Sequence, residues 1–118
     1  METFLWRLST FLTAIAKRFM IKVAELNELN NGERKSVFIE DIPSLLFRVE
    51  DSYYAIEDVC THDGQPLGEG ECVGTTIRCP RHGAKFDIQT GKALCMPAIN
   101  PVQTFLVEQR EDGIYAGL

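Results

Sequence analysis

The chain has 118 residues, of which 45% are hydrophobic and 25% charged, and these values indicate one globular domain with a core of its own. Its formal net charge is −5, which argues against nucleic acid as a partner because the phosphate backbone is also negative. An acidic surface suits docking on a basic face of another protein.

Residues 1–19 differ in composition from the rest of the chain. They carry three basic residues against one acidic residue, a charge of +2, whereas residues 20–118 carry −7. Apolar side chains recur at helical spacing with basic residues opposite, which predicts an amphipathic helix too short to span a bilayer. Three interpretations stay open: an extension without fixed structure, a start codon placed upstream of Met20, and a helix that docks on a membrane surface or a protein partner.

From Met20 onward the sequence predicts short strands separated by turns. Runs of apolar, β-branched and aromatic residues alternate with clusters of Gly, Asn and Asp. Such a series is typical of a β-sandwich or a small barrel. We expect a domain over residues 20–118 with strands at Ile21–Ala24, Ser36–Glu40, Leu45–Glu50, Tyr53–Val59, Thr75–Arg78, Ala84–Ile88, Lys92–Met96, Val102–Gln109 and Ile114–Ala116.

Two short segments each pair a cysteine with a histidine. They read CTHDGQ from Cys60 and CPRHGA from Cys79, and they contain the only histidines of the chain, His62 and His82. A thiolate and an imidazole on each of two Gly-containing loops indicate a metal site. Soft sulfur combined with borderline nitrogen suits zinc or iron–sulfur chemistry.

Zinc and iron–sulfur sites predict different ligand patterns. Structural zinc held by two cysteines and two histidines typically takes a CxxC pair and then two histidines on a helix. Here each loop is mixed, which suits two metals with different ligands. In a Rieske [2Fe–2S] centre two histidines replace two cysteines on one iron, so Cys60 and Cys79 would bind one iron and His62 and His82 the other.

The paired motif resembles that of the Rieske [2Fe–2S] family. Sixteen residues lie between His62 and Cys79, and the run CPRHGAKFD, a TGK turn and a segment around Pro97 follow as in that family. The resemblance covers residues 21–118 and implies an all-β, Rieske-type antiparallel β-sandwich with an inserted cluster-binding subdomain. It also implies that the segment around Pro97 packs over one [2Fe–2S] cluster per chain, held by Cys60, His62, Cys79 and His82.

Departures from the family pattern indicate a low-potential member. High-potential members carry an extra cysteine in each loop, and these form a disulfide, whereas Gln65 and Arg81 stand at those positions here. A serine and a tyrosine of the high-potential members are matched here by Ala84 and Phe86. Hydrogen bonds to the cluster stabilise its reduced form, so their loss places the reduction potential near the bottom of the family range of about −150 to +300 mV.

A stand-alone, low-potential Rieske domain is similar to the ferredoxin components of ring-hydroxylating dioxygenase systems. The resemblance implies an electron carrier, not an enzyme, with a flavin-dependent reductase and a terminal oxygenase as protein partners. Two alternatives stay open. One is the Rieske-like small subunit of a nitrite reductase or of another redox system, and the other is a zinc-stabilised β interaction module with the same four ligands.

The two other cysteines, Cys72 and Cys95, belong to no motif. We expect each to be a small buried apolar side chain, and a disulfide between them is a second hypothesis. Cysteines that serve as metal ligands instead of disulfides indicate a reducing compartment, so we expect a cytoplasmic protein.

Overall fold

The computed structural model describes residues 20–118. Within this range every regular element is a β-strand, which confirms the predicted all-β class. The predicted amphipathic extension, residues 1–19, lies outside the described residues. No segment between residues 20 and 118 forms a helix with the length and apolarity that crossing a bilayer requires.

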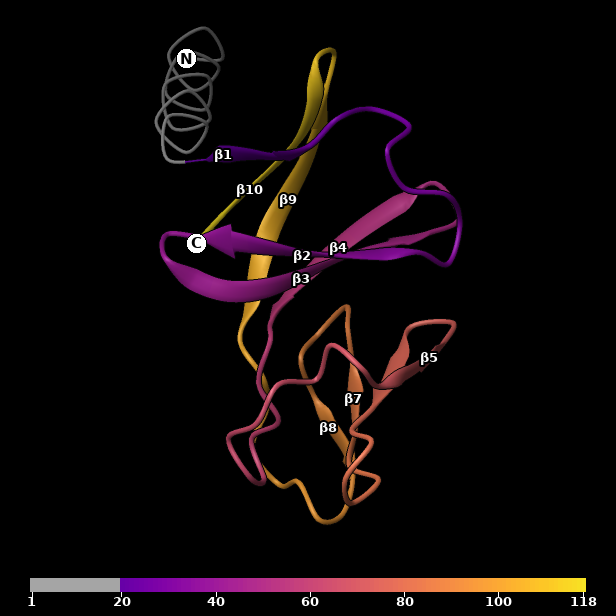
Figure 1. Ribbon diagram of the computed structural model, residues 1–118, viewed down its shortest axis with the longest axis vertical. Helices are drawn as coiled ribbons and strands as arrows, with labels where there is room; N and C mark the ends of the chain where they lie inside the picture. Colours follow the sequence, from indigo (N-terminus) through magenta and orange to yellow (C-terminus); the bar gives the residue numbers. More distant parts are fainter. Residues whose placement is uncertain (1–19) are drawn as a thin grey trace, which may run out of the picture.

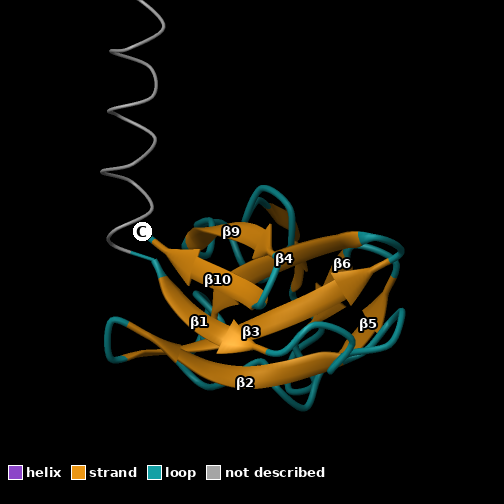
Figure 2. Cartoon of the chain, turned by 90° about the horizontal axis from the view of Figure 1, so that it is seen from above, coloured by secondary structure: helices purple, strands orange, loops and turns teal. Residues whose placement is uncertain are grey.

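Six strands form the larger sheet, which we call the main lobe (Figure 1). Neighbouring strands are antiparallel throughout. The sheet curls until its two edge strands contact each other, so the predicted sandwich-type fold takes the form of a near-barrel (Figure 2). In spatial order the strands are β1 (Ile21–Ala24), β10 (Gly113–Gly117), β9 (Thr104–Arg110), β4 (Ser52–Glu57), β3 (Ile42–Val49) and β2 (Arg34–Ile39).

A smaller antiparallel sheet is inserted between β4 and β9, and we call residues 60–101 the small lobe (Figure 1). This lobe confirms the predicted inserted subdomain. The sequence did not predict its first strand, which is short and pairs with the next strand across a tight turn at Gly74, where φ is 59°. In chain order its strands are β5 (Glu71–Val73), β6 (Thr76–Arg78), β7 (Lys85–Asp87) and β8 (Ala93–Cys95).

Strand β3 joins the cores of the two lobes because it is buried on both faces. Its consecutive residues Leu45, Leu46 and Phe47 are all buried. Leu46 belongs to the main-lobe core inside the near-barrel, whereas Leu45 and Phe47 belong to a second core shared with the small lobe. A strand buried on both faces is a continuous apolar run instead of an alternating one. The small lobe is therefore held against the outer face of β3.

The main-lobe core predicts that two leucines contribute very differently to the stability of the fold. We expect Leu46→Ala to lower the free energy of unfolding by about 2–5 kcal/mol, because it removes a fully buried side chain and leaves a cavity. Leu106→Ala on β9, where the side chain is 61% exposed, should change it by less than about 0.5 kcal/mol. Urea unfolding followed by circular dichroism measures both, and equal losses would contradict this description of the core.

Candidate metal centre

Two loops at the far end of the small lobe carry the predicted ligands. In the first loop, residues 60–65, the N–H of Cys60 donates to the carbonyl of Gln65 at 2.7 Å. The N–H of Gly64 donates back to the carbonyl of Cys60 at 2.7 Å. Gly64 has a φ of 74°, a backbone conformation that glycine adopts without steric cost. The loop is therefore a closed turn with the cysteine at its start.

The second loop, residues 79–84, repeats this turn. The N–H of Cys79 donates to the carbonyl of Ala84 at 2.7 Å, and the N–H of Gly83 donates to the carbonyl of Cys79 at 3.0 Å. Gly83 has a φ of 78°. The glycine four residues after each cysteine is the sequence signal for this turn, and each turn begins with its cysteine.

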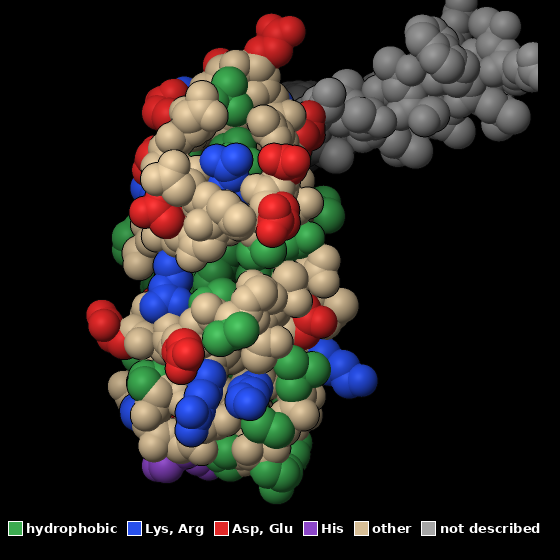
Figure 3. Space-filling view, turned by 90° about the vertical axis from the view of Figure 1, so that its right-hand side faces the viewer, with side chains coloured by type: hydrophobic (Ala, Val, Ile, Leu, Met, Phe, Trp, Pro, Cys, Tyr) green, Lys and Arg blue, Asp and Glu red, His purple; other side chains and the backbone are tan. Residues whose placement is uncertain are grey.

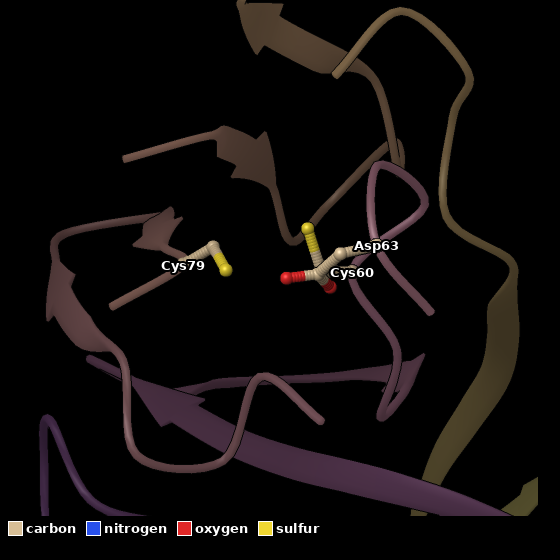
Figure 4. A group of neighbouring side chains, drawn as sticks. All are labelled: Cys60, Asp63 and Cys79. Carbon is tan, nitrogen blue, oxygen red and sulfur yellow. The ribbon is translucent and has the colours of Figure 1, made fainter. Parts of the chain in front are cut away.

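The thiols of Cys60 and Cys79 lie inside the protein. Both cysteines are 0% exposed and belong to the core shared by the two lobes. Their sulfur atoms and a carboxylate oxygen of Asp63 lie within 4.8 Å of one another. Figure 4 shows Cys60 and Asp63 on one side of this site and Cys79 on the other. The structure thus brings together two of the predicted ligands, although they are far apart in the sequence.

The imidazoles of His62 and His82 lie at the surface instead. Both residues are exposed, and Figure 3 shows histidine at the lower end of the molecule. Their ring centroids are 5.1 Å apart and the ring planes are nearly perpendicular, at 86°. Nitrogen atoms of both rings lie within 4.8 Å of each other and of a carboxylate oxygen of Asp63. The four predicted ligands therefore form two pairs, a buried pair of sulfurs and an exposed pair of nitrogens.

An ion pair between Asp63 and Arg81 joins the two loops. Nε of Arg81 donates to Oδ2 of Asp63 at 2.7 Å, and an Nη atom donates to Oδ1 at 3.3 Å. The N–H of Gln65 also donates to Oδ1, at 3.0 Å. The Arg81 guanidinium, and next the Gln65 N–H, hold the pKa of Asp63 well below its usual range. The carboxylate is therefore charged at neutral and mildly acidic pH, and the sequence analysis did not identify Asp63 as part of the site.

The segment around Pro97 contacts both loops. The hydroxyl of Thr61 in the first loop donates to the carbonyl of Asn100 at 2.7 Å. On the other side, Sγ of Cys95 lies 3.6 Å from the carbonyl oxygen of Gly83 in the second loop. Ala98 between them is buried in the core that contains both loop cysteines. This third segment fixes the two loops relative to each other.

The other two cysteines differ from the prediction in part. Cys72 on β5 is half-buried, but Cys95 on β8 is exposed, so the expectation of a buried Cys95 is wrong. The two lie on opposite edge strands of the small sheet and are both free, which contradicts the hypothesis of a disulfide between them. Burial raises the pKa of the Cys60 thiol and that of Cys72.

The separation of sulfur from nitrogen is the feature that discriminates between metals. Ligand atoms about 2.0–2.3 Å from a single zinc ion lie less than about 4 Å from one another. Among residues 20–118, the clusters of ligand atoms within 4.8 Å contain either the two thiols or the two imidazoles, each with Asp63, and none contains all four. The donor set therefore fits two metal ions, one with two sulfur ligands and one with two nitrogen ligands, as in a [2Fe–2S] centre of mixed ligation.

The geometry of the site predicts which of the four cysteines are needed for cluster binding. We expect Cys60→Ser and Cys79→Ser each to abolish cluster incorporation, because each removes one of the two buried thiols that we predict to bind iron. Cys72→Ser and Cys95→Ser are matched controls and should retain a full complement of iron and acid-labile sulfide. Visible absorption and metal analysis measure all four variants. Loss of the cluster in a control, or its retention in Cys79→Ser, would show that the ligand set is different.

The ion pair predicts a change in the lifetime of the bound cluster. Arg81→Gln removes the charged link between the loops, and we expect cluster loss to an iron chelator to become several-fold faster. Arg34→Gln on β2 removes the same charge outside the site and serves as the control. The rate is followed as bleaching of the visible absorption under anaerobic conditions. Equal rates in the two variants would contradict a role of Arg81 in holding the loops together.

Comparison with known proteins agrees with a [2Fe–2S] site in this chain. The family model described as "Rieske [2Fe-2S] domain" matches residues 19–106. The 3-phenylpropionate/cinnamic acid dioxygenase ferredoxin subunit of Photorhabdus laumondii is 35% identical over 102 residues, which cover 86% of this chain and 93% of that protein.

Two solved structures share the fold over most of the chain. The ferredoxin of carbazole 1,9a-dioxygenase from Nocardioides aromaticivorans IC177 has a TM-score of 0.79 and 28% identity, with 83% of this chain and 96% of that chain covered. A chain from a complex of reduced oxygenase and oxidized ferredoxin in carbazole 1,9a-dioxygenase has a TM-score of 0.78 and 34% identity, with coverages of 84% and 93%.

Proposed function

The chain belongs to the Rieske [2Fe–2S] family, and from this premise we propose that it is a ferredoxin that carries single electrons from a reductase to a terminal oxygenase. The observation that carries the proposal is the separation of two buried thiols from two exposed imidazoles. Relatives that match nearly their whole length are ferredoxin components of dioxygenase systems. The protein is thus an electron carrier of such a system and not its catalytic component.

The residues present fit one [2Fe–2S] cluster per chain. Cys60 and Cys79 would hold one iron, and His62 and His82 the other. When bound, the cluster supplies a redox site that takes up and gives back one electron. The mixed donor set is the property of this chain that distinguishes the centre from a ferredoxin cluster held by four cysteines.

The protein around the site controls access to each ligand pair. Ile77 and Phe86, both fully buried, pack in the same core as the two ligand cysteines and exclude water from the sulfur side. The histidines are exposed, so their rings provide the shortest route between the site and a partner's surface. Electrons would therefore enter and leave at the histidine end of the small lobe.

The comparisons also support the choice of partners. A structurally similar chain comes from a complex of an oxygenase with a ferredoxin, and we infer that this chain likewise docks on a terminal oxygenase. A flavin-dependent reductase would supply the electrons. We also propose a cytoplasmic location, since the four cysteines are all free and free thiols persist in reducing compartments.

Redox titration tests the proposed function. Anaerobically purified protein should show an electron paramagnetic resonance signal that appears on reduction and accounts for one electron per chain. The signal should titrate near −150 mV, about the lower end of the family range, because Ala84 and Phe86 lack hydroxyl groups. Colourless protein with zinc and no signal would contradict the proposal, and a high potential would contradict the account of its tuning.

The absence of hydroxyl groups can be tested separately. Ala84 is fully buried at the end of the second loop, and we expect Ala84→Ser to raise the potential. A hydrogen bond to a charged acceptor is worth about 1.5–3 kcal/mol, which corresponds to a shift of about 65–130 mV for one electron. Ala93→Ser on β8 is the control, because Ala93 packs at the edge of the same core. Equal potentials in the two variants would contradict this explanation.

A further inference from the structure

Charge is distributed unevenly between the two lobes. Among residues 20–59 and 102–118, which build the main lobe, five basic residues stand against twelve acidic ones. The small lobe, residues 60–101, has four of each. On the face drawn in Figure 3, acidic side chains gather over the main lobe, and basic side chains gather over the small lobe near the histidines. The two ends of the molecule therefore present different electrostatic fields to a partner.

The outer face of the small sheet contains a groove with two cations. The groove has a volume of about 400 Å³ and is lined by Glu71, Val73, Thr76, Arg78 and Lys85. The outward side chains alternate along the strands with the buried Ile77 and Phe86, so this is the face turned away from the core. We call the five lining residues the basic groove.

Arg78 and Lys85 lie directly opposite each other on β6 and β7. Like charges in this position are destabilising, and within residues 20–118 neither side chain is within ion-pair distance of a carboxylate. Glu71 stands opposite Arg78 on the other side but forms no ion pair with it. The two cations are thus available to an external carboxylate, and Val73, 68% exposed, adds an apolar contact beside them.

The basic groove adjoins the exposed histidines. The guanidinium of Arg78 covers Gly83, the residue after His82: a Cβ built on Gly83 would lie 3.3 Å from an Nη atom of Arg78. The carbonyl of the same Gly83 contacts Cys95, which precedes Met96, an apolar side chain 72% exposed. Arg78 and Cys95 therefore both approach Gly83, so the basic groove lies next to the second loop, which carries His82. Charged groups around an apolar centre are typical of protein–protein interfaces.

We propose that the basic groove is a docking surface for acidic side chains of a protein partner. The occupant follows from charge complementarity, because two unpaired cations face outward on a chain whose net charge is −5. Carboxylates bound by Arg78 and Lys85 would hold the partner against the histidine end, while repulsion from the main lobe would disfavour other orientations. The identification of this partner as an electron-transfer protein rests on the proposed function; the binding of acidic side chains does not.

Carbodiimide coupling tests the groove directly. The probe is a short N-acetylated oligoglutamate peptide, incubated with the anaerobically purified protein and a carbodiimide, which joins a carboxylate to a nearby lysine amine. We expect Lys85 to couple several times more peptide than Lys92, an exposed lysine that does not line the groove. Peptide mapping by mass spectrometry measures both. Equal coupling of the two lysines would overturn the proposal.

Salt and a matched pair of variants separate docking from lysine reactivity. The excess at Lys85 should vanish as salt rises from about 0.01 M to about 1 M, where the screening length falls from about 30 Å to about 3 Å. Arg78→Gln should also remove it, whereas Arg34→Gln should not. An excess that survives both salt and Arg78→Gln would mean that Lys85 is merely reactive. The comparison of lysines in unmodified protein holds even if Arg78→Gln folds poorly.

The result of the coupling experiment does not depend on which metal the protein binds. Uniform coupling in protein that shows the one-electron signal would overturn the docking surface alone. Selective, salt-sensitive coupling in protein without that signal would overturn the proposed electron-carrier function and leave the acidic-partner surface standing.

Discussion

The structure depends on one constraint: two thiols must be buried and two imidazoles exposed, although each loop carries one of each. A repeated turn meets this constraint. Each cysteine begins a turn closed by its own N–H and carbonyl, and a glycine with positive φ completes it. The cysteine then stays in the core while the histidine two or three residues later reaches the surface. Sulfur and nitrogen are separated because the backbone turns sharply between them.

The rest of the molecule holds these two loops at a fixed distance. Strand β3 supports the two loops, because Leu45 and Phe47 pack into the core that contains both cysteines. The segment around Pro97 contacts both loops, and Arg81 pairs with Asp63 across them. A noncovalent ion pair therefore links the loops that high-potential relatives join by a disulfide. This ion pair is weaker than a covalent bond, so the packed core also helps to hold the two loops in place.

The site was more predictable from the sequence than its surroundings. Two mixed Cys/His motifs are a strong signal because they contain both histidines of the chain, and the turn glycines at Gly64 and Gly83 are visible beside them. The Asp63–Arg81 pair was not predicted, since two residues eighteen positions apart give no sign of contact. Strand β5 was missed because three residues are too few to show a period. Cys95 was expected inside because cysteine is usually buried, but its edge strand leaves it exposed.

Mössbauer spectroscopy of protein enriched in iron-57 tests the central claim most directly, because it reports the ligand environment of each iron. If the buried thiols and the exposed imidazoles bind different irons, the oxidised protein will show two components of equal area, one for iron with two cysteine ligands and one for iron with two histidine ligands. A single component, or protein that holds zinc in place of iron, would contradict the separation of sulfur from nitrogen.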